Sequence, residues 1–479
     1  MLLIITILFP MIAGPLASLI PGKTERGRNI RYALIMIVTD ILSILSALYG
    51  GTVTLFRMTD KASFTFSPDS FGKIYLIMVM ILYTAVCFYA FEYMKTEERR
   101  EVFFGFYFVS LGALIAISLA GNLVTLYFCF ELATLSSVPM VLHEMTKEAV
   151  SAGLKYLFYS IAGALMGLLA VFFVYYYSGE TEGFVPGGIL DTGLLAGNEK
   201  VFLAVVFIGI LGFGTKAGLY PMHGWLPTAH PIAPAPASSL LSGIIAKAGV
   251  IAIVRLVYYS VGTDLLRGTW VQYAWMSLTM LTILMGSTCA FREKILKKRL
   301  AYSTVSQISY ILLGLSMMSD AGLRGGMIHL ISHAVSKGCL FLVAGIFICK
   351  LGKRSVTELK GVGKVMPVTL WCFMIASLSL VGIPPMGGFT SKWALAAASL
   401  ETGMGVFSFL PPIVLLISAL LTAGYLFPVA VDAFFPGQDF DSSTLEKKEP
   451  PLLMTLPLTV LCLVSLIAGI FGTRIVGII

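Results

Sequence analysis

The stretch GFGTKAGLYPMHGWLPTAHP, residues 212 to 231, follows the apolar run VFLAVVFIGIL and places Lys216 where a membrane helix would end. Three prolines then interrupt the segment: Pro221, Pro227 and Pro231. Proline removes a backbone donor and breaks a helix, and in hydrocarbon the freed carbonyl groups are tolerated only where protein or water satisfies them. The stretch therefore predicts a broken transmembrane helix.

A second interruption of the same kind occurs in SLVGIPPMGGFTSKWALAAA, where Pro384 and Pro385 precede Lys392. Two interrupted segments that lie about five helices apart, each with one lysine, indicate an inverted structural repeat, because an odd number of helices turns the second copy upside down. We expect Lys216 and Lys392 to be equivalent residues in two half-channels. A helix that is kinked only for packing is the alternative.

The composition assigns the chain to the membrane. Of its 479 residues, 57% are hydrophobic and 12% are charged, and the mean hydropathy is +0.90, which no soluble fold could bury. A hydrocarbon core of about 30 Å needs about 20 apolar residues per helix, and on that basis we predict an all-α polytopic membrane protein with about 14 transmembrane helices. The predicted helices cover residues 2–20, 30–56, 72–93, 102–119, 121–143, 151–178, 201–235 (broken), 237–260, 270–291, 300–318, 322–350, 366–404 (broken), 409–435 and 450–473.

The connections between these helices alternate in charge. The first, third, ninth and eleventh are rich in lysine and arginine, whereas the sixth is acidic. By the positive-inside rule the odd connections are cytoplasmic, so both termini face out, which agrees with an even number of spans. We interpret the first apolar run, Met1 to Ile20, as a retained helix and not a signal peptide. The expected location is the prokaryotic cell (inner) membrane.

Several classes of site are not expected. The seven cysteines are scattered singly, with no CxxC pair and no Cys/His cluster of metal-ligand spacing, which indicates packing residues and no metal site. The net charge of +8 lacks the clustered basic face that nucleic acid requires. No motif for flavin, haem or iron–sulfur cluster is present, so we expect no cofactor in this chain.

A small set of ionisable side chains lies at membrane depth. A charged group that faces lipid at the centre of a span costs roughly 3 kcal/mol or more, so these groups should face the bundle interior or a water-filled cavity. The predicted proton-translocation residues are Glu131, Lys216, Lys247, His329, His333, Lys337 and Lys392, with His223 and His230 beside the first break.

Glu131 lies about mid-span, and Lys216 is its expected partner, either as a titrating pair or as a purely structural one.

A second group lies on one helix face. His329, His333 and Lys337 are each four residues apart, so they share that face over about 12 Å. Histidine exchanges a proton near neutral pH, which suits a hydrated relay. A merely polar contact between helices is the alternative.

Five motifs carry a resemblance to a known family. They are FELATLSS with Glu131, KAGLYPMHGWLPTAHPIAPAPASSLLSGIIAKAGVIAIVR with Lys216 and Lys247, KKRLAYSTVSQISYI, HLISHAVSKGCLFLVAG, and GIPPMGGFTSKW with Lys392. Over roughly residues 100 to 430 the chain resembles the antiporter-like, proton-translocating membrane subunits of respiratory complex I, of Mrp sodium/proton antiporters and of membrane-bound hydrogenases.

The resemblance implies two inverted five-helix repeats, helices four to eight and nine to thirteen, broken at helices seven and twelve. The implied organisation is N-terminal helices in 1–100, a first repeat in 101–265, a second repeat in 266–436, and a C-terminal loop and helix in 437–479. Some members of the family have glutamate at the position of Lys392, so the lysine argues against that subtype. No long lateral helix is expected after the last span, which makes Mrp D-type subunits and their hydrogenase counterparts the nearest match.

The expected function is proton translocation as one membrane subunit of a redox-driven pump, with other antiporter-like subunits and the lipid bilayer as partners. Water would join the ionisable residues into a path. The alternative is a D-type subunit of an Mrp sodium/proton antiporter, without a redox partner. A structural subunit that has lost conduction is the third hypothesis, and the retained intramembrane charges argue against it.

Overall fold

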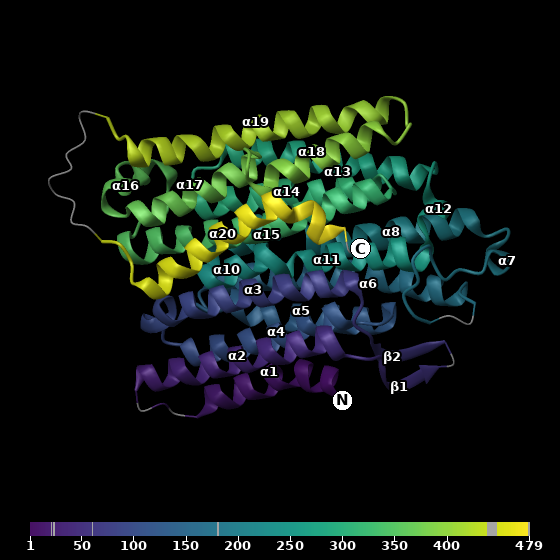
Figure 1. Ribbon diagram of the computed structural model, residues 1–479, viewed down its shortest axis with the longest axis horizontal. Coiled ribbons are helices and arrows are strands. Elements are labelled where there is room, and N and C mark those ends of the chain that lie inside the picture. The colour runs from purple at the N-terminus through teal and green to yellow at the C-terminus, as the bar shows by residue number, and fades with distance from the viewer. Residues whose placement is uncertain (21, 23, 60, 180–181, 438–447, 478–479) are drawn as a thin grey trace.

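The computed structural model describes residues 1–20, 22, 24–59, 61–179, 182–437 and 448–477. Its helices run side by side in one bundle, and the first residues of α1 and the last residues of α20 lie on the side of the bundle that carries the β-hairpin (Figure 1). The first half contains α1 (Leu2–Leu19), α2 (Glu25–Tyr49), α3 (Ser70–Tyr93), η1 (Met94–Thr96), α4 (Arg100–Leu119), α5 (Leu123–Val141), α6 (Lys147–Tyr176), α7 (Thr192–Leu195), α8 (Glu199–Ala217) and α9 (Leu226–Ile232).

The second half continues the bundle. It contains α10 (Ala235–Leu240), η2 (Leu241–Ile245), α11 (Lys247–Val254), η3 (Arg255–Val261), α12 (Thr263–Leu266), α13 (Trp270–Arg292), α14 (Leu296–Ser316), α15 (Asp320–Leu351), η4 (Val356–Leu359), α16 (Val362–Val365), α17 (Pro367–Val381), α18 (Gly387–Leu400), α19 (Val406–Phe434) and α20 (Leu452–Val476). The nearly all-helical membrane fold is therefore confirmed.

Within the described residues, 12 helices are long and apolar enough to cross a membrane. The helix α14 begins with basic residues, and α17 and α18 are short halves of one interrupted segment, so these elements fall outside that set. The predicted total of about 14 spans and the inverted repeat stay predictions.

The second predicted helix is wrong at its C-terminal end. The predicted range extends to residue 56, but α2 ends at Tyr49 and strand β1 (Val53–Thr59) pairs antiparallel with β2 (Ala62–Phe66). Two glycines, Gly50 and Gly51, follow α2, and glycine disfavours helix. The β-branched residues after them favour an extended strand.

The two predicted helix breaks are confirmed. The helix α8 ends at Ala217, and Gly218 adopts the left-handed region with φ of 79°. The indole Nε1 of Trp225 donates a 2.8 Å hydrogen bond to the carbonyl of Thr215, which satisfies one of the freed acceptors. In the second break Gly382 has φ of 92° at the end of α17.

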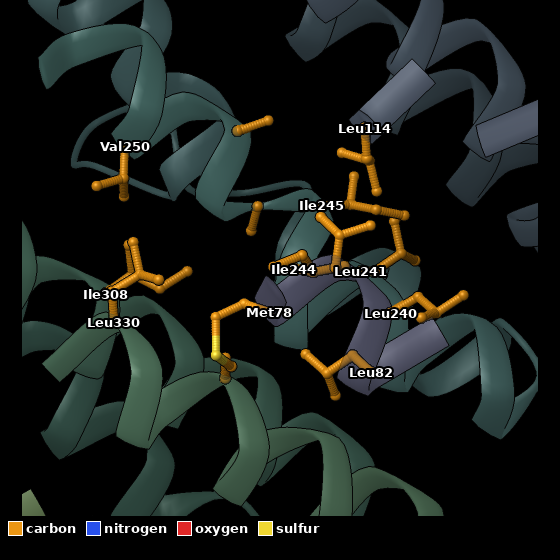
Figure 2. Close-up of a cluster of buried hydrophobic side chains, with 14 of the residues drawn as sticks. Met78, Leu82, Leu114, Leu240, Leu241, Ile244, Ile245, Val250, Ile308 and Leu330 are labelled. Atoms are coloured by element: carbon orange, nitrogen blue, oxygen red, sulfur yellow. The ribbon is translucent and has the colours of Figure 1, made fainter. Parts of the chain in front are cut away.

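A third irregularity was not predicted. The segment from Ala235 to Val261 is helical throughout but contains two π-helical stretches, η2 and η3. A π-helical turn holds more residues than an α-helical turn, so it changes which side chains face a neighbouring helix. Such turns recur at functional sites. Figure 2 shows Leu241 and Ile244 of η2 beside Met78 and Leu82 of α3 in the buried apolar core. The segment is thus enclosed by protein and does not face lipid.

Candidate ion-translocation site

Lys216 lies in the last turn of α8 and is buried. Its Nζ donates a 3.2 Å hydrogen bond to the carbonyl of Phe130 on α5, bonds to the hydroxyl of Thr134, and lies 4.3 Å from the centroid of the Phe130 ring. Glu131 is the next residue on α5 and is half-buried. No hydrogen bond or ion pair joins Glu131 to Lys216 among the described residues, although Lys216 is anchored one residue away from it.

Lys247 is the first residue of α11 and is fully buried. Its Nζ bonds to the carbonyl of Ser242 in the π-helical turn, and the hydroxyl of Ser242 lies 2.7 Å from that of Thr304 on α14. The helix α11 packs tightly on α8, because a Cβ added to Gly249 would lie 3.2 Å from the Cβ of Lys216. Lys216 and Lys247 therefore belong to neighbouring, closely packed helices.

Three of the predicted residues, His329, His333 and Lys337, lie on α15, and all three are buried. The ring centroids of His329 and His333 are 6.0 Å apart and the rings are stacked, as their spacing predicted. The Nδ1 of His329 lies 2.8 Å from the hydroxyl oxygen of Ser391, and Lys337 donates a 3.0 Å bond to the carbonyl of Leu300 on α14. His329 Nε2 and both ring nitrogens of His333 have no partner in the described part of the chain.

Lys392 lies just after the second break and is half-buried. Its Nζ donates hydrogen bonds of 2.6 and 2.8 Å to the carbonyls of Leu380 and Val381, which end α17. It also lies 5.1 Å from the ring centroid of Tyr310, whose ring centroid is 5.1 Å from that of His329. Tyr310 thus stands between His329 and Lys392.

The predicted break residues take positions at the surface. Pro221, Pro384 and Pro385 are exposed. His223 is half-buried and its ring stacks on Tyr220 with centroids 5.8 Å apart. The prolines therefore lie within the breaks, after the left-handed glycines that end α8 and α17, and away from the buried lysines and histidines.

His230 is fully buried, and its ring lies 4.7 Å from that of Phe341 on α15. Neither ring nitrogen has a partner among the described residues. The nearby Lys297 on α14, which the sequence prediction missed, is buried and bonds to the carbonyls of Ala233 and, at 3.4 Å, Pro231. The second half of the first broken helix thus places the buried His230 ring against α15 and binds Lys297 of α14 through the carbonyl of Pro231.

A polar face of α14 was also missed. Thr304, Gln307 and Tyr310 are fully buried, and Gln307 Oε1 and the Tyr310 hydroxyl lack partners in the described residues. Their three-residue spacing in KKRLAYSTVSQISYI was the available signal, because residues three apart lie on one face of a helix. Thr304 of this face contacts Ser242, which binds Lys247. Tyr310 contacts His329 and Lys392 directly.

The arrangement suits proton transfer through water better than direct transfer. Within the described residues no two of the seven predicted side chains are hydrogen-bonded or ion-paired to each other. Buried polar atoms without a protein partner are costly, and ordered water is their usual partner. The unpaired nitrogens and oxygens of His329, His333, Gln307 and Tyr310 include acceptors and donors that water can join.

A family model described as "NADH:quinone oxidoreductase/Mrp antiporter, TM" matches residues 120–422. The chain belongs to this family. Every predicted proton-translocation residue falls within the matched range. The resemblance inferred from the five motifs is thereby confirmed.

Relatives of both predicted kinds are found. The N-type subunit of NADH-quinone oxidoreductase from Desulforudis audaxviator is 30% identical over 99% of this chain and 96% of its own length. The D-type subunit of a Na⁺/H⁺ antiporter from Alkalihalophilus pseudofirmus is 26% identical over 98% of this chain and 93% of its own length.

A solved structure of the archaeal membrane-bound sulfane sulfur reductase complex contains a chain with the same fold. It aligns with a TM-score of 0.84 and 21% identity, and it covers 100% of this chain and 95% of that chain. The likeness shows that this fold occurs within a multi-subunit membrane complex.

Proposed function

We propose that this chain translocates protons as one membrane subunit of a redox-driven complex of the complex I or membrane-bound hydrogenase type. The observation that carries the proposal is the succession of lysines and histidines, buried except for the half-buried Lys392, on the packed pairs of helices α8 with α11 and α15 with α18. An interior that only had to be packed would gain nothing from such groups, because each is costly in hydrocarbon. The similarity to an NADH-quinone oxidoreductase subunit agrees with it.

In this proposal Glu131 and Lys216 form the loading end. Burial disfavours the charged lysine and a nearby carboxylate favours it, so a change in their separation changes how readily Lys216 holds its proton. Lys216 is anchored to the residue before Glu131, so a small movement of α5 against α8 would alter that separation. Such a movement is how a redox module elsewhere in the complex would act on this chain.

The proton path then runs through Lys247, Lys337, His333 and His329 to Lys392, with water between them. The polar face of α14 supports this order, because Thr304 contacts the residue that holds Lys247, and Tyr310 stands between His329 and Lys392. Tyr310 and Gln307 add a hydroxyl and an amide oxygen to the same interior. In this proposal the protein sits in a prokaryotic cell membrane with both termini outside.

A second candidate is sodium/proton exchange in an Mrp-type assembly, which the similarity to a D-type antiporter subunit favours. The same residues would serve both functions. Purification of the native complex distinguishes them, because redox subunits that copurify with this chain support the first candidate and an assembly of antiporter subunits alone supports the second.

The test is coupled proton pumping by the assembled complex in membrane vesicles. Glu131→Gln and Lys216→Ala are each expected to lower pumping about tenfold or more, since a positioned proton donor or acceptor typically contributes at least that much to a proton-transfer step. Lys364→Ala is the matched control, because Lys364 is exposed and lies outside the path. Unchanged pumping in both variants would remove this pair from the mechanism.

A further inference from the structure

One half-buried carboxylate is not used by the proposed path. Asp40 lies in α2, and its Oδ2 accepts a 2.7 Å hydrogen bond from the hydroxyl of Thr84 on α3. Its Oδ1 is shielded and has no partner within the described residues. No lysine or arginine in that part of the chain is ion-paired with it. An aspartate at membrane depth without a counter-charge is costly, so its environment calls for a partner.

Asp40 lines a hollow of about 500 Å³ between α2, α3 and α20. Apart from Asp40 and Thr84 its walls are apolar, with Ile44, Phe88 and Val460 among them. Ile44 is 49% exposed and Val460 is 40% exposed, so the hollow opens on the outer surface of the bundle. It is separate from the buried line of lysines and histidines.

The hollow continues toward the start of α2. A second hollow of about 580 Å³ shares Phe88 with the first and is lined by Glu25 and Asn29 of α2, by Lys95, and by Leu453 of α20. From Asp40 to Glu25 this groove follows α2 for about 22 Å at 1.5 Å per residue. A groove of that length along two helices matches the side of a third helix.

The depth of Asp40 restricts what can balance its charge. It lies about 22 Å from one end of α2 and about 14 Å from the other, which is close to the centre of a hydrocarbon core about 30 Å thick. Lipid headgroups remain at the interface and cannot reach that depth. A basic side chain on a transmembrane helix can, and pairing offsets part of the cost of both charges.

We infer that the groove along α2, α3 and α20 seats a transmembrane helix of another subunit, whose lysine or arginine pairs with Asp40. The inference concerns assembly and holds for either proposed function. It assigns Asp40 to the subunit interface and not to the proton path. The chain of the same fold in the sulfane sulfur reductase structure belongs to a multi-subunit membrane complex, in which such interfaces between subunits occur.

The experiment is site-specific photo-cross-linking in the purified native complex, with a photoreactive side chain at Ile44. A second probe at Leu165 of α6, which is 59% exposed and outside the groove, measures background. We expect the Ile44 probe to capture one helix of a neighbouring subunit that contains lysine or arginine, and the Leu165 probe not to capture it. Lipid adducts alone, the same peptides from both probes, or a captured helix without a basic residue would overturn the inference.

The charge of Asp40 is tested in a second experiment. The first experiment leaves Asp40 unchanged, so misfolding of an Asp40 variant cannot determine its result. Asp40→Asn keeps the shape of the side chain and is expected to lower the yield of the Ile44 cross-link about tenfold, because the partner's charge is left unpaired. Asp40→Glu is expected to retain it. An equal yield from Asp40→Asn and the unchanged chain would contradict the pairing. The readout does not involve proton transport, so its failure is distinct from failure of the proposed function.

Discussion

The Nδ1 atom of His329 lies 2.8 Å from the hydroxyl oxygen of Ser391, the residue immediately before Lys392. This contact fixes the imidazole of α15 against α18 at the point where the second broken helix resumes. Ser391 also donates a 3.0 Å hydrogen bond to the carbonyl of Gly388 in the first turn of α18. The orientation of His329 is therefore set by the same turn that carries Lys392.

Ser391→Ala removes this contact without changing a charge. We expect proton translocation by the assembled complex to fall several-fold, because a ring free to rotate no longer presents Nε2 in one direction, and a misplaced group slows transfer. Ser391→Thr keeps the hydroxyl and should retain most of the rate. Equal loss in both variants would indicate a packing effect and not a positioning one.

A high-resolution cryo-EM map of the complex should contain ordered water beside His333, His329 and Tyr310. The expectation follows from their buried, unpaired polar atoms, each of which loses a hydrogen bond if no water is present. Water within hydrogen-bond distance of both ring nitrogens of His333 is the expected result. Apolar side chains packed against those nitrogens would contradict it.

Arg255, the first residue of η3, is paired with Asp69 at the start of α3. It is buried, donates a 2.7 Å hydrogen bond to Asp69 and lies 4.4 to 4.8 Å from the ring centroids of Phe184, Tyr259 and Phe71. Arg255→Met should destabilise the protein by about 1–3 kcal/mol, less than for a fully buried pair because Asp69 is partly exposed.

Thermal unfolding of the detergent-solubilised protein measures this effect. Arg267→Met is the matched control, since Arg267 pairs with Asp264 at 2.8 Å but both side chains are exposed, and surface pairs contribute about 0–1 kcal/mol. A melting temperature lowered equally by both substitutions would contradict the assigned role of Arg255.

Glu358 supports the loop after α15 in a pH-dependent manner. Its carboxylate accepts hydrogen bonds from the backbone N–H groups of Ser355 at 2.8 Å and Arg354 at 2.9 Å, and these bonds hold the pKa of Glu358 below its ordinary value. Since the pKa is depressed in the folded loop, the stabilisation is present above the ordinary pKa and is lost as pH falls through the depressed pKa.

Amide hydrogen exchange of residues 354–359 tests this sign by comparing the protein with Glu358→Gln. At neutral pH the unchanged loop should exchange more slowly than the variant, and the ratio should approach one as Glu358 becomes protonated. A ratio that does not depend on pH would exclude the carboxylate as the cause.

The sequence predicted those features that local chemistry alone determines. Clusters of proline and glycine interrupt a helix whatever packs around it, so both breaks were predicted. His329 and His333 are four residues apart, which places their rings next to each other on one helix face. The hairpin after α2 was missed because the apolar strand residues extend the hydropathic pattern of the helix.

The contacts of the site depend on tertiary packing and were not predictable. Lys216, Lys337 and Lys392 each donate to a backbone carbonyl, and sequence carries no signal for such partners. Asp40 was left out of the predicted set, although it lies within the predicted second helix, residues 30–56. The link between Glu131 and Lys216 stays a prediction.

The central claim is that protons pass through the middle of the chain, where Lys247 is fully buried. Coupled proton translocation by the complex with Lys247→Met tests this claim most directly. We predict that electron transfer continues at a reduced rate while translocated protons per electron fall, because no group remains to carry the proton between the two halves. An unchanged number of protons per electron would contradict the account.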